Sequence, residues 1–418
     1  MGGNMNKEID KLIDRMEEEA KDFFQLREKI TLLNQEKILK AMQKNKLAAS
    51  DFHWTTGYGY GDGGRDKVEA IYKDVFHTED ALVRPNIVSG THAIFLAVSS
   101  FLRQGSELLS LCGPLYDTMQ KAIGLTGEES GNLLSRGVSY QEVPLKDGQM
   151  NLDLFKDFIS EKTSLVVIQR STGYSQRRAF TIQEIKEAID RVRSINSRIP
   201  IFVDNCYGEF TEILEPTDLG VDIMAGSLIK NPGGGLAYCG GYIVGKAKYI
   251  DHIANLLTAP GIGKECGLSF GMTRQILQGL FMAPHVVSEA LKGALLFAKC
   301  FESLSYPCIP QSNDPRSDII QSIVFKDPEK LKAFCEEIQK SSPVDAHFIP
   351  TPWDMPGYED PVIMAAGGFI EGSSIELSAD GPMRQPYIAY FQGGLTYAHC
   401  RISLRNVLKR FKDENWIS

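Results

Sequence analysis

Features typical of membrane, secreted and metal-binding proteins are missing from this sequence. No apolar run approaches the roughly 18 residues of a membrane span, and the charged segment NKEIDKLIDRMEEEAKDFF lacks the apolar core of a secretory signal. There is no HExxH motif and no Cys/His ligand cluster, so we expect no metal site. The 8 cysteines lack CxxC spacing, which predicts reduced, mostly buried thiols in a cytoplasmic protein. They are Cys112, Cys206, Cys239, Cys266, Cys300, Cys308, Cys335 and Cys400.

An excess of positive charge is also missing. The net charge is −8 and the sequence pI is about 5.5, which argues against nucleic acid as the main partner because phosphate binding needs a basic face. Hydrophobic residues make up 43% and charged residues 23% of the 418 residues. This balance predicts a globular protein with a sizeable core, and the length of 418 residues predicts two to three domains.

The chain begins with a predicted helical segment, residues 1–50. Ile9, Leu12, Ile13 and Met16 recur at helical spacing with charges between them. A long charged helix of this kind packs either on its own chain or on another subunit, and the sequence leaves both alternatives open.

Residues 51–304 contain two kinds of segment in alternation. Apolar runs alternate with amphipathic stretches, which predicts a large α/β domain with a mostly parallel sheet. The expected strands are ELLSLCG (107–113), SLVVIQRS (164–171), IFVDNC (201–206), DIMAGSLI (222–229) and LAYCGGYIVG (236–245). The expected helices are THAIFLAVSSFLRQG, NLDLFKDFIS and TIQEIKEAIDRVRSIN, the last with a capping box of Thr181 and Glu184.

Residues 305–418 predict a smaller α+β domain. One helix is expected to begin with Asp327 as N-cap and Pro328 at its first position, and to run through Lys340. Short strand-like runs surround this helix and are grouped rather than alternating with helices. They are VDAHFIP, VIMAAGGFI, SSIELSAD, PYIAYFQGG and CRISL.

Lys230 and Asp204 are the first candidates for chemistry. Lys230 ends an apolar run, and burial there would lower its pKa and free the amine for imine formation. Asp204 closes an apolar strand at the sheet edge where α/β folds bind ligands. In a pyridoxal 5′-phosphate (PLP) site, such a carboxylate would pair with the pyridinium nitrogen, and Tyr207 could reach the phenolic oxygen of the cofactor. In isolation, a solvent-facing lysine and a turn or cap aspartate remain alternatives.

A phosphate site is predicted where SGTH opens a helix. The free N–H groups after Ser89, at Gly90 and Thr91, would cradle a phosphate, and Ser227 could add a hydroxyl. Tyr116 follows a strand and could stack on a flat cofactor. An ordinary helix cap and a core tyrosine are the alternatives.

A second glycine motif does not support a nucleotide site. Residues 59–64 fit GxGxxG, but the preceding DFHWTTGY is aromatic and polar. A dinucleotide site requires an apolar strand at that place.

Taken together, these parts resemble the fold type I PLP enzymes, the aspartate-aminotransferase-like superfamily. More narrowly, the chain resembles the cystathionine β-lyase and methionine γ-lyase-like family known as aluminium resistance proteins. The matching blocks include TTGYGYGDGGRD (55–66), ALVRPNIVSGTHAI (81–94), GSLIKNPGGGLAYCGGYIVG (226–245), MPGYEDPVIMAAGGFI (355–370) and IELSADGPMRQPY (375–387).

The resemblance implies a role for each matching residue. Lys230 would form the Schiff base and move the proton, and Asp204 would be the partner of the pyridinium. Tyr116 would stack on the ring, and Gly90, Thr91 and Ser227 would bind the phosphate. It also implies a homodimer or homotetramer with active sites at the subunit interface.

Two arginines that related families use to bind the cofactor phosphate are absent from their usual positions in this sequence. NPGGGLAYCGG holds no arginine after the lysine, which disfavours an aminotransferase. Cystathionine lyases lend a Tyr-x-Arg pair to the neighbouring subunit, and Tyr58, Tyr60 and Arg65 have a related composition at a different spacing. We therefore expect Arg65 and Tyr58 or Tyr60 to reach the cofactor phosphate of a neighbouring subunit, with a salt bridge or cap of Arg65 within its own helix as the alternative. A substrate carboxylate favours a bidentate arginine, for which Arg384 is the first candidate and Arg401 the second.

The favoured hypothesis is a PLP-dependent lyase acting on a sulfur-containing amino acid. An aminotransferase on the same fold is the second hypothesis. A PLP-binding protein with little turnover, used for cofactor homeostasis or regulation, is the third. The substrate is expected to be a small amino acid, with neither nucleic acid nor a membrane as partner.

Overall fold

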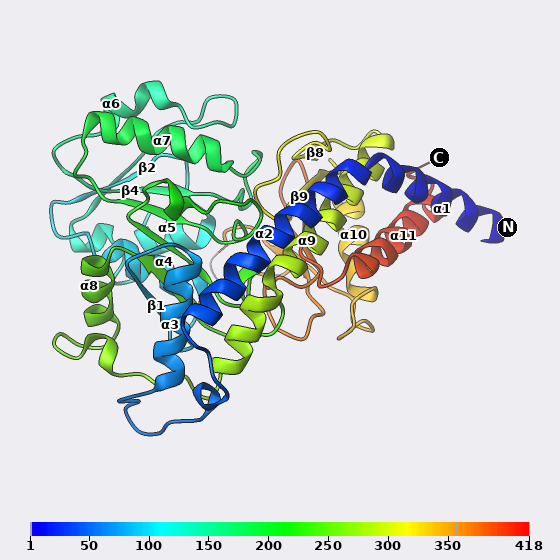
Figure 1. Cartoon of the computed structure of the whole chain (residues 1–418). Helices are drawn as coiled ribbons and strands as arrows, with labels where there is room; N and C mark the ends of the chain where they lie inside the picture. The colour runs from blue at the N-terminus through cyan, green and yellow to red at the C-terminus, as the bar shows by residue number, and fades with distance from the viewer. Residues whose placement is uncertain (1, 356–357, 418) are drawn as a thin grey trace.

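The larger part of the molecule is built on one seven-stranded sheet. The computed structural model describes residues 2–355 and 358–417 (Figure 1). The strand order is β1-β7-β6-β5-β4-β2-β3; β2 to β6 pair in parallel, and β7 is antiparallel to both of its neighbours. The strands are β1 (Asp80–Arg84), β2 (Glu107–Ser110), β3 (Ser139–Glu142), β4 (Thr163–Gln169), β5 (Ile201–Asp204), β6 (Ile223–Ser227) and β7 (Gly241–Gly245). All five expected strands are present, although β7 begins later than predicted.

Helices connect these strands because parallel strands need crossovers. Strands such as β5 and β6 are buried along their whole length, as expected for a sheet covered on both faces. The predicted capping box of Thr181 and Glu184 opens α7. The helices are α3 (Gly63–Val75), α4 (Gly90–Ser99), α5 (Asp117–Ile123), α6 (Phe155–Phe158), α7 (Ile182–Ile195) and α8 (Ala247–Leu257). The mixed α/β fold with a mostly parallel sheet is therefore confirmed.

The smaller part has a five-stranded antiparallel sheet in the order β10-β11-β12-β9-β8. The strands are β8 (Cys308–Ile309), β9 (Ile320–Val324), β10 (Val362–Ala365), β11 (Ser378–Pro382) and β12 (Ile388–Gln392), with helices α10 (Pro328–Lys340) and α11 (Tyr397–Asp413). The Asp327 cap of α10 is confirmed, since its Oδ1 accepts a hydrogen bond from Glu329 N at 2.9 Å. Within the matching block 355–370, residues 356 and 357 lie outside the described part.

Two of the predicted strands in this part are wrong. VDAHFIP forms bends and a turn. CRISL lies in α11, because the buried positions Cys400, Leu404, Val407 and Phe411 continue at helical spacing beyond the run that suggested a strand.

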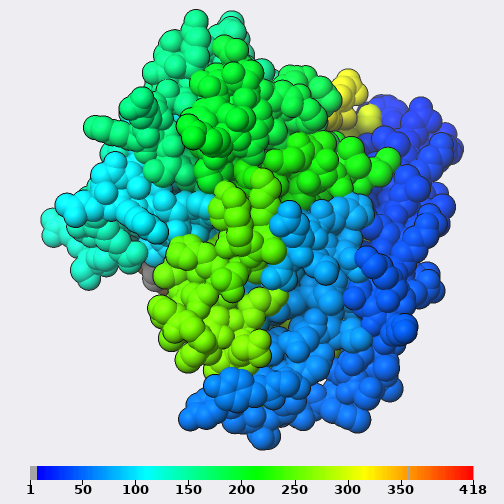
Figure 2. All heavy atoms as spheres, turned by 60° about the vertical axis from the view of Figure 1, so that its left-hand side comes forward, coloured from blue at the N-terminus to red at the C-terminus, as the bar shows by residue number. Residues whose placement is uncertain are grey.

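The N-terminal segment forms two helices, α1 (Gly2–Glu19) and α2 (Lys21–Lys44). α1 packs on α11 and on the long helix α9 (Thr273–Ser303), and α2 packs on α9 and α3. The structure thus shows packing on the segment's own chain. Figure 2 shows this segment along one edge of the molecule, where exposed leucines lie on α2. They are Leu26, Leu32, Leu33 and Leu39.

α9 is long and apolar enough to cross a membrane by length and composition alone. However, 72% of its most apolar window is buried inside the protein. Its side chains join both hydrophobic clusters, one around the large sheet and one in the smaller part. We therefore describe α9 as a core helix.

Candidate active site

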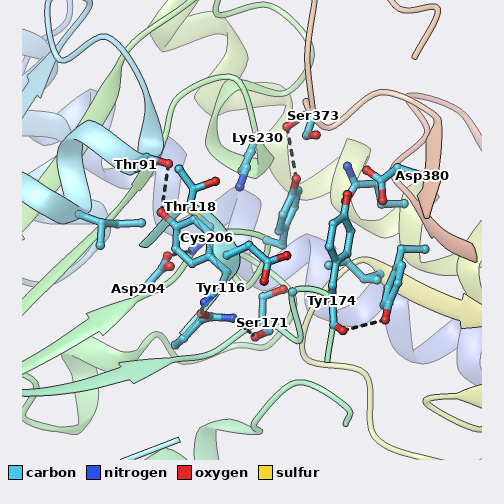
Figure 3. Close-up of a pocket in the computed structure, with 18 of the residues that line it drawn as sticks. Thr91, Tyr116, Thr118, Ser171, Tyr174, Asp204, Cys206, Lys230, Ser373 and Asp380 are labelled. Carbon is cyan, nitrogen blue, oxygen red and sulfur yellow. Dashed lines mark hydrogen bonds between the residues drawn. The ribbon is translucent and has the colours of Figure 1, made fainter. Parts of the chain in front are cut away.

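A cavity of about 230 Å³ lies between the carboxyl edge of the parallel strands and the smaller sheet. Figure 3 shows Lys230 pointing into it, with Asp204 and Tyr116 on one side and Asp380 on the other. Among the described residues that line the cavity, Lys230 is the only cation, and the anions are Asp117, Asp204 and Asp380.

Lys230 is held by the loop that joins β6 to β7. Its Nζ lies 3.8 Å from the centroid of the Tyr207 ring. The loop turns sharply after Lys230, and a Cβ on Gly233 would lie 1.8 Å from the Leu228 carbonyl oxygen. No other residue fits there without moving the backbone, so the glycines after the lysine fix its direction.

The pKa of Lys230 moves in the direction opposite to the expected one. Burial lowers this pKa, but the neighbouring Cys206, Tyr207, Asp204 and Tyr116 outweigh burial, and the net shift is upward. The expectation that burial alone decides the shift is therefore wrong. The raised pKa keeps Lys230 as an ammonium group beside these acidic neighbours.

Asp204 is the last residue of β5, and its carboxylate is buried. Its Oδ1 accepts a hydrogen bond from Cys206 N at 3.0 Å. Burial raises the pKa of Asp204, while Lys230 and this hydrogen bond oppose the rise. Tyr207 lines the same cavity, and its hydroxyl donates to the Ser373 carbonyl oxygen at 3.3 Å.

The predicted phosphate cradle adjoins the cavity. Ser89 caps α4 by accepting from His92 N at 3.0 Å. A Cβ on Gly90 would lie 2.9 Å from the Ser227 Cβ, so only glycine lets the helix start approach β6 this closely. The hydroxyl of Tyr116 donates to Thr91 Oγ1 at 3.0 Å. The structure thus brings Ser89, Gly90, Thr91, Tyr116, Asp204, Tyr207, Ser227 and Lys230 together.

Arg65 is placed differently from the prediction that it reaches the phosphate of a neighbouring subunit. Its guanidinium is buried, and Nη1 donates to the carbonyl oxygens of Gly59, Glu265 and Gly267 at 2.8, 3.3 and 3.1 Å. Its Nε donates to Asp66. This arginine is therefore committed to its own chain, where it anchors the loop that carries Tyr58 and Tyr60. Those two phenols are 73% and 63% exposed.

The two predicted carboxylate-binding arginines lie in different places. Arg401 is on α11 and pairs with Glu17 and Asp14 of α1, so this prediction is wrong because the helix turns it away from the cavity. Arg384 pairs with Asp360 at 2.9 Å. Its charge acts on Asp117 and Tyr390, which both line the cavity, so it lies near the cavity mouth.

Comparison with known proteins shows the family of this chain. Residues 9–412 match the family described as methionine gamma-lyase. The chain belongs to the methionine gamma-lyase family. It is 52% identical over 376 residues to the protein YnbB of Bacillus subtilis, covering 90% of this chain and 89% of that one.

Solved structures agree with this membership. A protein from Clostridium novyi described as a carbon-sulfur lyase involved in aluminium resistance is 47% identical with a TM-score of 0.93, covering 97% of this chain and 96% of that one. A Listeria monocytogenes protein assigned as a cystathionine beta-lyase involved in aluminium resistance is 46% identical with a TM-score of 0.93, covering 96% and 99%. A PLP-dependent protein from Escherichia coli, at 16% identity and a TM-score of 0.62, shares the fold. The resemblance found in the sequence is confirmed.

The family implies PLP, and the described residues fit it. The start of α4 packs tightly on β6 at Gly90 and Ser227, and the adjoining pocket is lined by Ser89, Gly90, Thr91 and Ser227, where the free N–H groups of the helix start can bind an anion. The buried carboxylate of Asp204 suits a protonated ring nitrogen, and Lys230 supplies the amine. The anion site, the carboxylate for the ring nitrogen and the amine thus lie within one continuous region of the molecule.

Sequence reasoning missed the smaller domain's side of the cavity. Asp380 and Tyr390 come from β11 and β12, and Tyr174 and Tyr358 come from loops. No strand-end pattern marks them. One signal in the sequence could have indicated Asp380 and Tyr390. The runs SSIELSAD and PYIAYFQGG were both expected to be strands, and pairing them as neighbours brings their polar residues side by side.

Proposed function

We propose that this protein is a PLP-dependent lyase that breaks a carbon–sulfur bond in a sulfur-containing amino acid. The observation that carries this proposal is the placement of Lys230 and Asp204 in one buried cavity beside an anion cradle. Family membership supports the same reaction class. When bound, PLP supplies the aldehyde that captures the substrate amine and the ring that accepts the electron pair from the α-carbon.

The chain's own residues supply positioning and proton transfer. Lys230 is the cavity amine able to hold the cofactor and, once released, to take a proton from the substrate α-carbon at its Nζ. Asp204 keeps the ring nitrogen protonated, and Tyr116, hydrogen-bonded to Thr91, offers its ring as a stacking face. Arg384 is proposed to bind the substrate carboxylate at the mouth of the cavity.

A product assay tests this function. The purified protein, supplied with PLP, is incubated with cystathionine, methionine, cysteine, and alanine plus a keto acid. We expect thiol, ammonia and keto acid to appear together. Amino transfer that depends on the keto acid, without thiol release, would instead establish an aminotransferase. Absence of turnover with every substrate would favour a PLP-binding protein.

We further propose that each active site is shared between two subunits through Tyr58 and Tyr60. The dianionic phosphate needs a polar lining, and around the cradle the described residues supply Lys230 as the only cation. The Arg65-anchored loop presents the two phenols to solvent with their ring centroids 5.8 Å apart, a suitable arrangement for docking on a partner.

Complementation between variant chains tests the shared site. A chain with Tyr58→Ala and Tyr60→Ala should be inactive, as should a Lys230→Ala chain. Under subunit exchange, hybrid dimers contain one site with all three residues intact, so we expect about half of the activity per hybrid to return. Demonstrated exchange without recovered activity, or full activity of the double tyrosine variant, would contradict sharing.

A further inference from the structure

A carboxylate faces the cavity from the smaller domain. Asp380 lies in β11, is 6% exposed, and lines the cavity that Lys230 enters from the larger domain. In Figure 3 Asp380 lies on the side away from Asp204 and Thr91, with Tyr174 directly beside it. The roles assigned above to Lys230, Asp204 and the phosphate cradle leave Asp380 unused.

Tyrosine side chains line the same cavity as this carboxylate. Asp380 pairs with Tyr390 across β11 and β12. The Tyr174 ring lies 4.8 Å from the ring of Tyr390 and 5.4 Å from that of Tyr358, measured between centroids. A buried carboxylate in a cavity that is also lined by tyrosine rings is chemically suited to an ammonium group, which can gain both an ionic hydrogen bond and a cation–π contact.

Asp380 has no salt bridge within the described part of the chain. Burial raises the pKa of Asp380 to about 7, and a hydrogen bond from Tyr174 and the charge of Lys230 limit the rise. A buried carboxylate without an ion pair is costly, and a cation from outside would remove that cost. The titratable groups that face it from the surrounding elements are Lys230, Tyr174, Tyr207, Tyr358, Tyr390 and Cys335.

We propose that Asp380, with the rings of Tyr174 and Tyr390, binds a second ammonium group carried on the sulfur substituent of the substrate. This inference rests on the proposed lyase function and names the substrate class for it. The amine that reacts must reach Lys230, so the group that reaches Asp380 belongs to the other end of the thioether. Asp380 is thus a specificity residue that favours a diamino thioether over a simple alkyl thioether.

Two substrates that share a carbon–sulfur bond but differ in the second ammonium group distinguish a specificity role of Asp380 from a general role in catalysis. Cystathionine carries the second ammonium group, and S-methylcysteine lacks it. In Asp380→Asn, which keeps the side-chain volume but removes the charge, we expect kcat/KM for cystathionine to fall about ten- to hundred-fold. The value for S-methylcysteine should stay within about twofold. Asp117→Asn, a second carboxylate lining the cavity, is the matched control and should not discriminate between the two substrates.

The pH dependence provides an independent readout. The ionised form of Asp380 binds an ammonium group, so wild-type kcat/KM for cystathionine should rise as the pH passes about 7. This step should be absent in Asp380→Asn and absent with S-methylcysteine. Tyr174→Phe removes a hydrogen bond that stabilises the carboxylate, and should move the step to higher pH. An unmoved step would contradict the proposal.

The outcomes distinguish this inference from the lyase function. If Asp380→Asn lowers kcat/KM equally for both substrates, the specificity role is wrong while the lyase function stands. If the wild-type protein releases thiol from neither substrate, the lyase function itself fails. Circular dichroism and the visible absorbance of bound PLP check that the variant is folded and loaded, and Tyr174→Phe tests the same proposal if Asp380→Asn does not fold.

Discussion

Replacing Lys230 by alanine is expected to reduce turnover by at least about 10⁴-fold, the largest effect of any single change. The substitution removes both the amine that holds the cofactor and the base proposed to take the α-proton, and proton transfer alone contributes about 10²- to 10⁴-fold. Borohydride reduction of the wild-type protein followed by peptide mapping should place a pyridoxyl group on Lys230. The measurements are single-turnover thiol release and the mass of the labelled peptide.

Controls separate lost chemistry from lost folding. Lys246 lies at the far end of β7, where it pairs with Asp222, and Lys246→Ala should keep both activity and the label on Lys230. Small primary amines added to Lys230→Ala should restore part of the proton transfer. A pyridoxyl label on another lysine in the wild-type protein would overturn the assignment of this site.

The larger domain's side of the site was predictable because it depends on local rules. Asp204 ends β5 and Lys230 follows β6, and these two parallel strands pair at Asp204 and Ala225. The carboxyl ends of parallel strands meet at one sheet edge, so strand order in the sequence was enough to bring these residues together. The cradle at Gly90 was found for a similar reason, because a helix start binds anions through its backbone.

The remaining parts depend on contacts between distant segments. The burial of Arg65 is set by carbonyl groups about 200 residues away along the chain, which the composition of its loop does not reveal. Arg401 was misplaced because five residues of an amphipathic helix also read as an apolar strand. Asp380 reaches the cavity only through the packing of the two domains, which no local pattern encodes.

Replacing Asp204 by alanine is expected to have the second largest effect. Removing one partner from a buried charge pair costs about 3–5 kcal/mol, which corresponds to roughly 2 × 10²- to 5 × 10³-fold in rate if the cost falls on the transition state. Asp204→Asn has nearly the same volume and keeps an oxygen that can accept from Cys206 N. We expect it to lose nearly as much activity as Asp204→Ala, because charge rather than shape is what the ring nitrogen requires.

A cofactor analogue distinguishes this electronic role from a structural one. PLP methylated on its ring nitrogen carries a permanent positive charge and needs no carboxylate to keep that charge. Asp204→Ala reconstituted with this analogue should recover at least about tenfold in kcat over the same variant with ordinary PLP, while the wild-type protein should gain nothing. If the analogue binds, as judged by its absorbance, but activity does not return, Asp204 acts by positioning Cys206 and Lys230, and its proposed pairing with the ring nitrogen is wrong.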